Sequence, residues 1–265
     1  EDKQENKMKV PLHLALIPDG NRRWAKAKGL PGFKGHEAGE KKFEEILDWC
    51  MELGIRMVTV YTLSQENFSR SREEVEFLLK LIKSHIQKFA KDKKVHKNKV
   101  RLNVIGNLDL LPQDLKKAAA EAMDATKNYN NHTLNLAVAY GGRQEIIDAT
   151  KKIAEKARDG KIGLGQIDET LFSKNLYAEL PDVDLLIRTS EQRLSGFLLW
   201  QSAYAEVVFL EDKILDPYKQ QYMEDPEEKI LAISPTPLQW EFPFELFDKI
   251  SNLRAICLTS TAFGW

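Results

Sequence analysis

The chain has 265 residues, enough for one large α/β domain or two small ones with a buried core. Its 39 basic and 40 acidic side chains leave a formal net charge of −1, so overall charge predicts neither a nucleic-acid partner nor an acidic one. Two unpaired cysteines, Cys50 and Cys257, and five scattered histidines argue against a disulfide scaffold, a thiolate metal site and a histidine zinc site.

The apolar runs are too short for a membrane-spanning helix, which needs about 18 residues. The N-terminal segment, residues 1–11, is polar and does not have the pattern of a signal peptide. We therefore expect a cytoplasmic protein that can still handle an apolar substrate.

Short apolar runs alternate with longer segments of helical periodicity along the chain. We predict strands over residues 12–17, 57–63, 100–105, 133–139, 184–187 and 207–210. We predict helices over residues 37–53, 71–89, 112–128 and 143–157. In the second helix, Ser71 is the expected N-cap, with Glu74 completing a capping box. This alternation predicts a single α/β domain, residues 12–210, with a mostly parallel central sheet flanked by helices.

Polar residues follow most of the predicted strands. In open α/β sheets, ligands bind at the carboxyl ends of the strands, so these turns are the candidate site. The turns cover residues 19–24, 64–70, 106–107, 140–143 and 188–195. Arginine, asparagine, serine and glycine dominate four of the five, and that combination suits a bound polyanion.

The first turn combines a carboxylate with two arginines. If Asp19 or Asn21 caps a helix that starts at Arg22, free N–H groups and the two guanidinium groups can face a phosphate. Asp19 then fits best with a cation between itself and the phosphate, and Mg²⁺ commonly uses one or two carboxylates plus diphosphate oxygens. For this turn alone, a plain Asp N-cap with surface arginines is the favoured interpretation.

The second basic turn lies near the end of the chain's fifth predicted strand. Arg188, Arg193 and Ser195 could hold a second phosphate group, Glu191 could orient an arginine, and Glu206 could supply a second metal carboxylate. A surface loop with internal salt bridges explains the same residues.

The remaining patterns have simpler alternatives. Ser64, Asn67 and Arg70 form a third polar turn, for which local capping before the next helix competes. The lysine-rich segment 91–99 is typical of a solvated helix end, since no aromatic residues interleave with its charges as RNA binding would favour. An apolar helical stripe around Leu78 and Leu81 could line a channel, although core packing is the default. Together the turns and the stripe suggest a ligand with a diphosphate head and a hydrocarbon tail.

Five motifs between His13 and Leu210 occur in an order that is specific to one family: DGNRRWAK, GHEAG, VYTLSQENFSRSREEV, LNLAVAYGGRQEI, and DLLIRT followed by EQRLSGFLLWQSAYAEVVF. With these motifs the sequence resembles the cis-prenyltransferases, the undecaprenyl and dehydrodolichyl diphosphate synthases. Phe68 stands where bacterial members usually carry tryptophan, which resembles the archaeal and eukaryotic branch.

The resemblance implies a homodimer that uses Mg²⁺ to condense isopentenyl diphosphate with an allylic prenyl diphosphate into a cis-polyprenyl diphosphate. It also implies peripheral membrane association for product release and no nucleic-acid partner. The implied roles are as follows: metal binding by Asp19 and Glu206; catalysis by Asp19, Ser64 and Asn67; allylic diphosphate binding by Gly20, Asn21, Arg22 and Arg23; isopentenyl diphosphate binding by Arg188, Arg193 and Ser195; and further substrate contacts from Trp24, His36, Phe68 and Arg70.

The sequence departs from the family pattern at three places. Gly32 stands where an arginine is usual, and Gly196 stands where asparagine is preferred. The Ser190-Glu191 turn is one glycine shorter than the family pattern. Segment 211–265 is atypical and lacks an Arg-x-Gly motif. We expect this segment to pack on the domain or on the dimer interface. These departures keep two alternatives open: a weakly active or non-catalytic partner subunit, and a phosphate- or RNA-binding α/β module. Product length is expected to depend on residues along the channel: Thr62, Leu63, Phe77 and Leu81.

Overall fold

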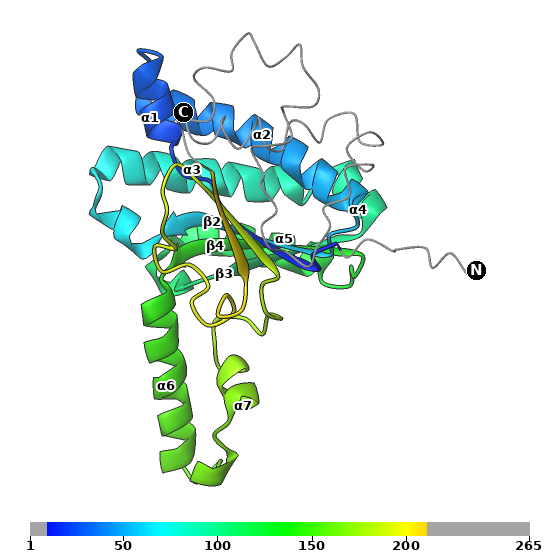
Figure 1. The fold of residues 1–265 in the computed structure, drawn as a ribbon, viewed down its shortest axis with the longest axis vertical. Coiled ribbons are helices and arrows are strands. Elements are labelled where there is room, and N and C mark those ends of the chain that lie inside the picture. The colour runs from blue at the N-terminus through cyan, green and yellow to red at the C-terminus, as the bar shows by residue number, and fades with distance from the viewer. Residues whose placement is uncertain (1–9, 211–265) are drawn as a thin grey trace, which may run out of the picture.

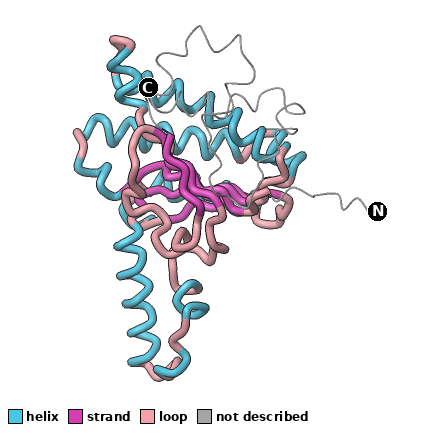
Figure 2. The backbone as a smooth tube through the Cα atoms, in the orientation of Figure 1, coloured by secondary structure: helices cyan, strands magenta, loops and turns pink. Residues whose placement is uncertain are grey.

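The computed structural model describes residues 10–210, which build one six-stranded sheet (Figures 1 and 2). The strand order is β3-β4-β2-β1-β5-β6, and every neighbouring pair is parallel. The strands are β1 (His13–Ile17), β2 (Met57–Ser64), β3 (Val100–Ile105), β4 (His132–Tyr140), β5 (Leu185–Thr189) and β6 (Glu206–Leu210). The predicted α/β class and parallel sheet are confirmed. The expected packing of segment 211–265 lies outside the described residues.

Seven α-helices connect these strands in the described part of the chain. They are α1 (Asn21–Ala27), α2 (Gly32–Glu52), α3 (Arg72–Phe89), α4 (Lys93–Asn98), α5 (Gln113–Thr126), α6 (Gly142–Arg158) and α7 (Glu169–Ser173). Short 3-10 helices occur at Gln65–Ser69, Leu108–Leu110 and Leu164–Gln166. The four predicted long helices are present, and α2 begins earlier than predicted. The lysine-rich segment forms a separate short helix, α4, whose lysines are exposed as expected.

Strand register sorts side chains onto the two faces of the sheet. Leu14 pairs with Val58, and Val58 pairs with Leu134, so aliphatic side chains form a row across three strands. Successive residues of a strand point to opposite faces, which puts Ala15 and Thr59 on the other side. The first face carries the larger core, and the second face carries a smaller one.

The larger core packs the first face against α2, α3 and α5. It contains Ile46 from α2, Ile82 from α3 and Leu115 from α5. The smaller core covers Ala15 and Leu186 with Tyr140, Phe197 and Leu198. Figure 1 shows α2 and α3 lying along one side of the sheet, while α6 and α7 extend away on the other side.

The turn into α1 differs from the sequence-based expectation. Gly20 holds the N-cap position with φ 102°, a left-handed conformation that suits glycine, and no side chain caps the helix. The predicted N-cap from Asp19 or Asn21 is therefore wrong: the Asp19 carboxylate accepts a hydrogen bond from the Gly20 N–H (2.7 Å) instead. The turn leads the chain directly from β1 to the two arginines of α1.

Candidate active site

Four of the five predicted turns meet at one edge of the sheet. The central strands run in the order β4-β2-β1-β5, so their carboxyl ends are neighbours. Asp19, Ser64, Gly141 and Arg188, one from each of these ends, line a single cavity. The turn after the outer strand β3, residues 106–107, is not among the described residues that line it.

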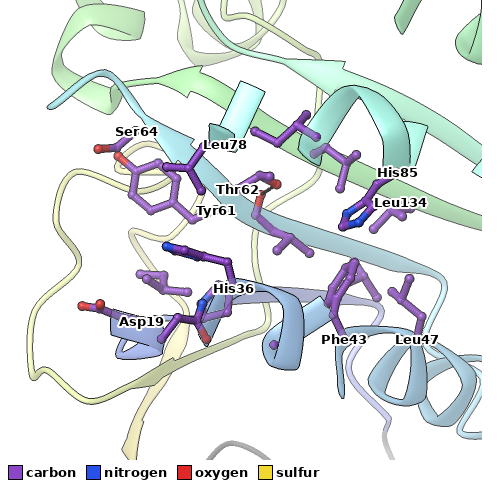
Figure 3. A pocket seen from close by; sticks show the side chains of 18 of the residues that line it. Asp19, His36, Phe43, Leu47, Tyr61, Thr62, Ser64, Leu78, His85 and Leu134 are labelled. Atoms are coloured by element: carbon purple, nitrogen blue, oxygen red, sulfur yellow. Dashed lines mark hydrogen bonds between the residues drawn. The ribbon is translucent and has the colours of Figure 1, made fainter. Parts of the chain in front are cut away.

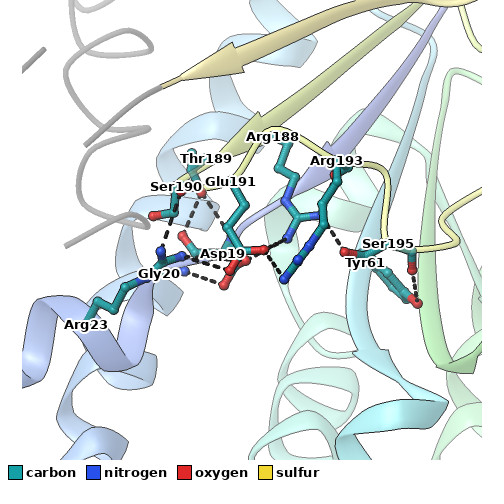
Figure 4. Close-up of polar contacts among 10 residues, drawn as sticks. All are labelled: Asp19, Gly20, Arg23, Tyr61, Arg188, Thr189, Ser190, Glu191, Arg193 and Ser195. Atoms are coloured by element: carbon teal, nitrogen blue, oxygen red, sulfur yellow. Dashed lines mark hydrogen bonds and ion pairs between the residues drawn. The ribbon is translucent and has the colours of Figure 1, made fainter. Parts of the chain in front are cut away.

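Asp19 is held in place by its backbone. Its N–H donates to Thr189 Oγ1 (2.9 Å), and the Thr189 hydroxyl donates to the Asp19 carbonyl oxygen (2.6 Å). Carboxylate oxygen Oδ1 accepts from the Gly20 N–H, while Oδ2 lies 2.8 Å from Nη2 of Arg188 and 3.7 Å from Nη2 of Arg23 (Figure 4). The Asp19 carboxylate thus has a defined position at the mouth of the cavity.

Arg188 connects the first polar turn with the last. Its side chain is only 3% exposed. Nη1 donates to the Arg193 carbonyl oxygen and to Ser195 Oγ (2.6 Å), and Nη2 donates to Asp19 Oδ2 and to Glu191 Oε2 (3.0 Å). A guanidinium group stays charged when buried, so Arg188 presents a fixed positive charge at the carboxyl end of β5.

Glu191 lies in the middle of an arginine cluster (Figure 4). Its carboxylate is 3.0 Å from Nη2 of Arg188 and 3.6 Å from Nη2 of Arg23, and it also contacts Nη2 of Arg193. Two of these arginines are at the surface, since the side chains of Arg193 and Arg23 are 68% and 46% exposed. We call Arg23, Arg188 and Arg193 the arginine cluster below.

A second basic group lies between α1 and α3. Glu74 accepts from Nη1 of Arg70 (2.9 Å) and pairs with Nη1 of Arg22 (3.6 Å). The N-cap at Ser71 is confirmed, because Ser71 Oγ accepts from the Glu74 N–H (3.3 Å). The Glu74 carboxylate pairs with the two arginines and does not accept from the Ser71 N–H. The second hydrogen bond of the predicted capping box therefore does not form.

His36 lines the cavity beside this second group. Burial, and after it the charge of Arg70, lower the pKa of His36 to about 4. Its Nε2 is buried with no hydrogen-bond partner in the described part of the chain. The ring is therefore a neutral group with a free polar atom next to two arginines.

The third polar turn is capped locally, as the sequence allowed. The Ser64 N–H donates to Asn67 Oδ1 (3.1 Å), and both residues line the cavity along with Arg70. Phe68 packs against the larger core. Neither Phe68 nor Trp24 is among the described residues that line the cavity.

The cavity has a polar mouth and an apolar interior. Its volume is about 1480 Å³. Figure 3 shows Asp19 and Ser64 at one end and Phe43, Leu47 and Leu134 at the other. Among the residues expected along the channel, Thr62 and Leu81 line it. The expectation for Leu63 and Phe77 is wrong: neither is in the lining, because Leu63 is buried in the larger core and Phe77 packs on Phe33.

Glu206 does not reach this site within one chain. It is the first residue of β6 and pairs with Leu185, the first residue of β5. It therefore lies at the amino end of the strands, whereas Asp19 lies beyond their carboxyl ends. The metal role expected for Glu206 therefore does not form beside the Asp19 carboxylate of the same chain, and it stays a prediction.

Two supporting residues were not singled out from the sequence. Thr189 fixes the Asp19 backbone, and the Tyr61 hydroxyl donates to the carbonyl oxygens of Tyr140 and Ser195 (both 3.3 Å). Tyr61 also stacks on Phe197, with ring centroids 4.6 Å apart. Tyr61 lies inside one of the motifs, but its partners are far away in the chain, so no local pattern identifies its role.

The donor set fits a metal ion that arrives with its ligand. No group of three or more His, Cys, Asp or Glu residues within 10–210 is arranged to hold a metal by itself. Asp19 offers one carboxylate that is 36% exposed and faces the cavity mouth. Mg²⁺ is commonly bound by one or two carboxylates together with phosphate oxygens, and Asp19 meets that requirement.

Comparison with known proteins identifies relatives over most of the chain. The prenyltransferase family model, described as undecaprenyl diphosphate synthase, matches residues 17–224. A geranylgeranyl-diphosphate-specific tritrans,polycis-undecaprenyl-diphosphate synthase from Pyrococcus abyssi is 52% identical over 204 residues, which cover 76% of this chain and 77% of that protein. The enzyme of the same name from Thermoplasma volcanium is 51% identical over 201 residues, 75% and 78% of the two chains.

Solved structures give the same result for the fold. Lavandulyl diphosphate synthase from Lavandula x intermedia, in complex with dimethylallyl diphosphate, is 37% identical with a TM-score of 0.72, covering 75% of this chain and 86% of that one. A probable undecaprenyl diphosphate synthase from Campylobacter jejuni is 32% identical with a TM-score of 0.63, covering 77% and 87%. In the described part of the chain, no helix combines the length and the apolar character that crossing a bilayer requires.

Proposed function

The chain belongs to the undecaprenyl diphosphate synthase family and is a cis-prenyltransferase, and on that premise we propose that it condenses isopentenyl diphosphate with an allylic prenyl diphosphate into a cis-polyprenyl diphosphate. The observation that carries the proposal is the cavity, whose arginine-rich mouth continues into an apolar interior of about 1480 Å³ in total. The named specificity of the archaeal relatives makes geranylgeranyl diphosphate the first primer to test.

We assign the two diphosphate groups to the two basic groups of the mouth. Arg22, Arg70 and the half-buried His36 line the cavity and suit the allylic diphosphate, together with the backbone of Gly20 and Asn21. Arg188, Arg193 and Ser195 suit isopentenyl diphosphate. Arg23, which follows Arg22 in α1 and pairs with Glu191, can serve either group. Trp24 and Phe68 are outside the described cavity lining, so we assign them no direct substrate contact.

The chain's own groups then perform three tasks. The arginines stabilise negative charge on the departing allylic diphosphate. The fixed position of Arg188 holds the second substrate in line with the first. Ser64 at the end of β2 and Asn67 in the 3-10 helix that follows both line the cavity, and we assign them to the reacting centre and to the proton that leaves isopentenyl diphosphate.

We assign Mg²⁺ to Asp19, together with diphosphate oxygens of the substrate. When bound, Mg²⁺ neutralises charge on the diphosphate. Glu206 faces the amino end of the sheet, so a metal role for it requires a second copy of the chain.

A homodimer is part of the proposal. Among residues 10–210, β6 is an edge strand of the sheet and Tyr204 is 90% exposed, and both suit contact with a second copy. Ile147 on α6 and Leu164 after the end of α6 are exposed apolar residues, and they also favour a dimer interface. Peripheral association with a membrane would serve the release of an apolar product.

The direct test is product analysis by mass spectrometry after incubation with isopentenyl diphosphate and geranylgeranyl diphosphate, with and without Mg²⁺. We expect polyprenyl diphosphates only when Mg²⁺ is present. We expect Asp19→Asn to reduce turnover by about 10²- to 10³-fold while melting normally, because it removes the carboxylate next to the diphosphate.

Three results would contradict parts of this proposal. Activity that appears only after addition of a second, different subunit would support the partner-subunit alternative. Full turnover by Asp19→Asn would remove Asp19 from the metal role. A salt-sensitive shift of RNA, lost when the lysines of segment 91–99 are replaced, would instead support the RNA-binding alternative.

A further inference from the structure

Glu191 places a negative charge among the arginines to which the proposed function assigns a diphosphate group. The carboxylate contacts all three members of the arginine cluster, at 3.0 Å from Arg188, at 3.6 Å from Arg23 and in direct contact with Arg193. We propose that Glu191 is an internal competitor, which occupies the anion site in the free protein and must be displaced by the incoming diphosphate. This inference rests on the proposed role of the arginine cluster as a diphosphate site.

The two carboxylates at the mouth are held in different ways. The Asp19 carboxylate accepts a hydrogen bond from the Gly20 N–H, and two hydrogen bonds with Thr189 fix the Asp19 backbone. The hydrogen bonds and ion pairs of the Glu191 side chain are with Arg23, Arg188 and Arg193. The Glu191 carboxylate can therefore leave without breaking a backbone hydrogen bond, whereas moving the Asp19 carboxylate breaks its bond from the Gly20 N–H.

The arginines also divide into a fixed one and two movable ones. Arg188 is buried and keeps its hydrogen bonds to Ser195 Oγ and the Arg193 carbonyl oxygen whether or not Glu191 is present. The side chains of Arg23 and Arg193 are largely exposed and can follow a ligand. Displacement of Glu191 would leave three guanidinium groups facing one anion, the arrangement that favours bidentate phosphate binding.

The backbone before Glu191 explains its position. Ser190 has φ 71°, a conformation that costs free energy for a residue other than glycine. The Glu191 N–H donates to the Thr189 carbonyl oxygen (2.9 Å), and the Ser190 N–H donates to the Leu210 carbonyl oxygen (2.9 Å). This tight turn folds Glu191 back over the end of β5, and the 29% exposure of its side chain leaves a path to solvent.

A competitor of this kind sets a threshold for ligand binding. Every anion has to break the same contacts of Glu191, so an anion with few contacts of its own stays unbound. A diphosphate has more charge and more oxygens, and it can replace all three contacts at once. Glu191 would thereby exclude orthophosphate and other small anions from the site.

The rival interpretation is that Glu191 orients the arginines for the ligand. The two interpretations predict opposite results when the Glu191 charge is removed. If Glu191 competes, Glu191→Gln binds the anion more tightly; if it orients, the same variant binds more weakly.

The test is isothermal titration of inorganic pyrophosphate and orthophosphate into the full chain in metal-free buffer. We expect Glu191→Gln to bind pyrophosphate about fivefold more tightly than the unchanged protein, the size expected for losing partly exposed ion pairs. Orthophosphate binding should become measurable only in this variant. Glu191→Asp, which keeps the charge but shortens the reach, should bind pyrophosphate with intermediate affinity.

The matched control is Glu76→Gln, which removes the same charge from the exposed Arg72–Glu76 pair on α3 (2.8 Å) and leaves the cavity untouched. It should bind pyrophosphate as the unchanged protein does. Equal or weaker binding by Glu191→Gln, in a variant with a normal melting curve, would overturn the competitor role, and so would a failure of both proteins to bind.

The condensation assay separates this result from the proposed function. A protein that condenses its substrates, but whose Glu191→Gln variant does not bind pyrophosphate more tightly, contradicts the competitor role alone. A protein that neither condenses substrates nor binds pyrophosphate in any variant contradicts the proposed function as well.

Discussion

The buried guanidinium group of Arg188 shows how single residues determine this site. It remains charged at 3% exposure, and a buried charge is tolerated only when it is paired and hydrogen-bonded. Asp19, Glu191, Ser195 Oγ and the Arg193 carbonyl oxygen meet that requirement together. Because the buried Arg188 needs these partners, its hydrogen bonds hold the turn after β1 against the loop after β5.

His36 gives a prediction at the same scale. Its pKa is about 4 in the folded chain, mainly because of burial, against about 6.5 in the unfolded chain. The unfolded state therefore binds more protons between these values, so the contribution of His36 to stability is present above about pH 6.5 and is lost as the pH falls towards 4. The loss should not exceed about 3–4 kcal/mol.

NMR titration of labelled histidine side chains checks this value directly, and melting temperature against pH checks its consequence. The melting temperature of a His36→Gln variant should fall less steeply below pH 6.5 than that of the unchanged protein. A His36 titration midpoint near 6.5 would show that the ring is not desolvated in solution.

At the scale of elements, the hairpin of α1 and α2 places Arg22, Arg23 and His36 over the end of the sheet. The two helices approach closely at Gly35, where an added Cβ atom would lie 2.0 Å from the Asn21 carbonyl oxygen. Gly32, one turn earlier in α2, has open space: an added Cβ atom would lie 3.7 Å from Cγ of Arg22, an ordinary contact. The departure from the family pattern at Gly32 is therefore not required by packing.

These two glycines make a matched pair of variants. Gly35→Ala should destabilise the chain by about 1–3 kcal/mol, because the backbone of α1 has to move. Gly32→Ala should be neutral or stabilise by up to about 1 kcal/mol, because it restricts only the unfolded chain. Urea unfolding measures both, and similar values for the two variants would contradict the close approach at Gly35.

At the scale of the whole molecule, the cavity exists because α2, α3 and the sheet face do not pack completely against one another. Residues from β2, β4, α2 and α3 line it, so no single segment contains it. The apolar interior extends from the mouth at Asp19 along the face of the sheet that carries the larger core. A growing hydrocarbon chain would be kept out of water along this path.

Leu81 tests this use of the interior. Leu81→Trp adds bulk inside the cavity and should shorten the products by at least one isoprene unit, seen in the mass distribution. Phe77→Trp adds bulk on the same helix but outside the cavity lining, where the Phe77 and Phe33 ring centroids are 5.8 Å apart. This variant should leave product length unchanged. Equal product lengths for both variants would argue against this path.

The sequence by itself determined the α/β class, the parallel sheet and most of the long elements. The signals for these features are local. Hydrophobic periodicity, the Ser71 cap and the apolar run of β4 can each be recognised from neighbouring residues. It also identified Asp19, Arg188, Arg193 and Ser195 as residues of one site, because strand ends in such sheets meet at one edge.

Only the tertiary structure decided how these residues are used. Strand order brought the Asp19 turn against Arg188 and left Glu206 at the opposite end of the sheet. Packing around α3 put Leu81 in the cavity lining and Phe77 against Phe33. It also showed Glu191 among three arginines and Tyr61 beneath the loop that ends at Ser195. The contacts of Asp19 with Arg188, of Glu191 with Arg23 and of Tyr61 with Ser195 each join residues more than a hundred positions apart. The energy of a buried charge depends on such distant partners, which no local pattern specifies.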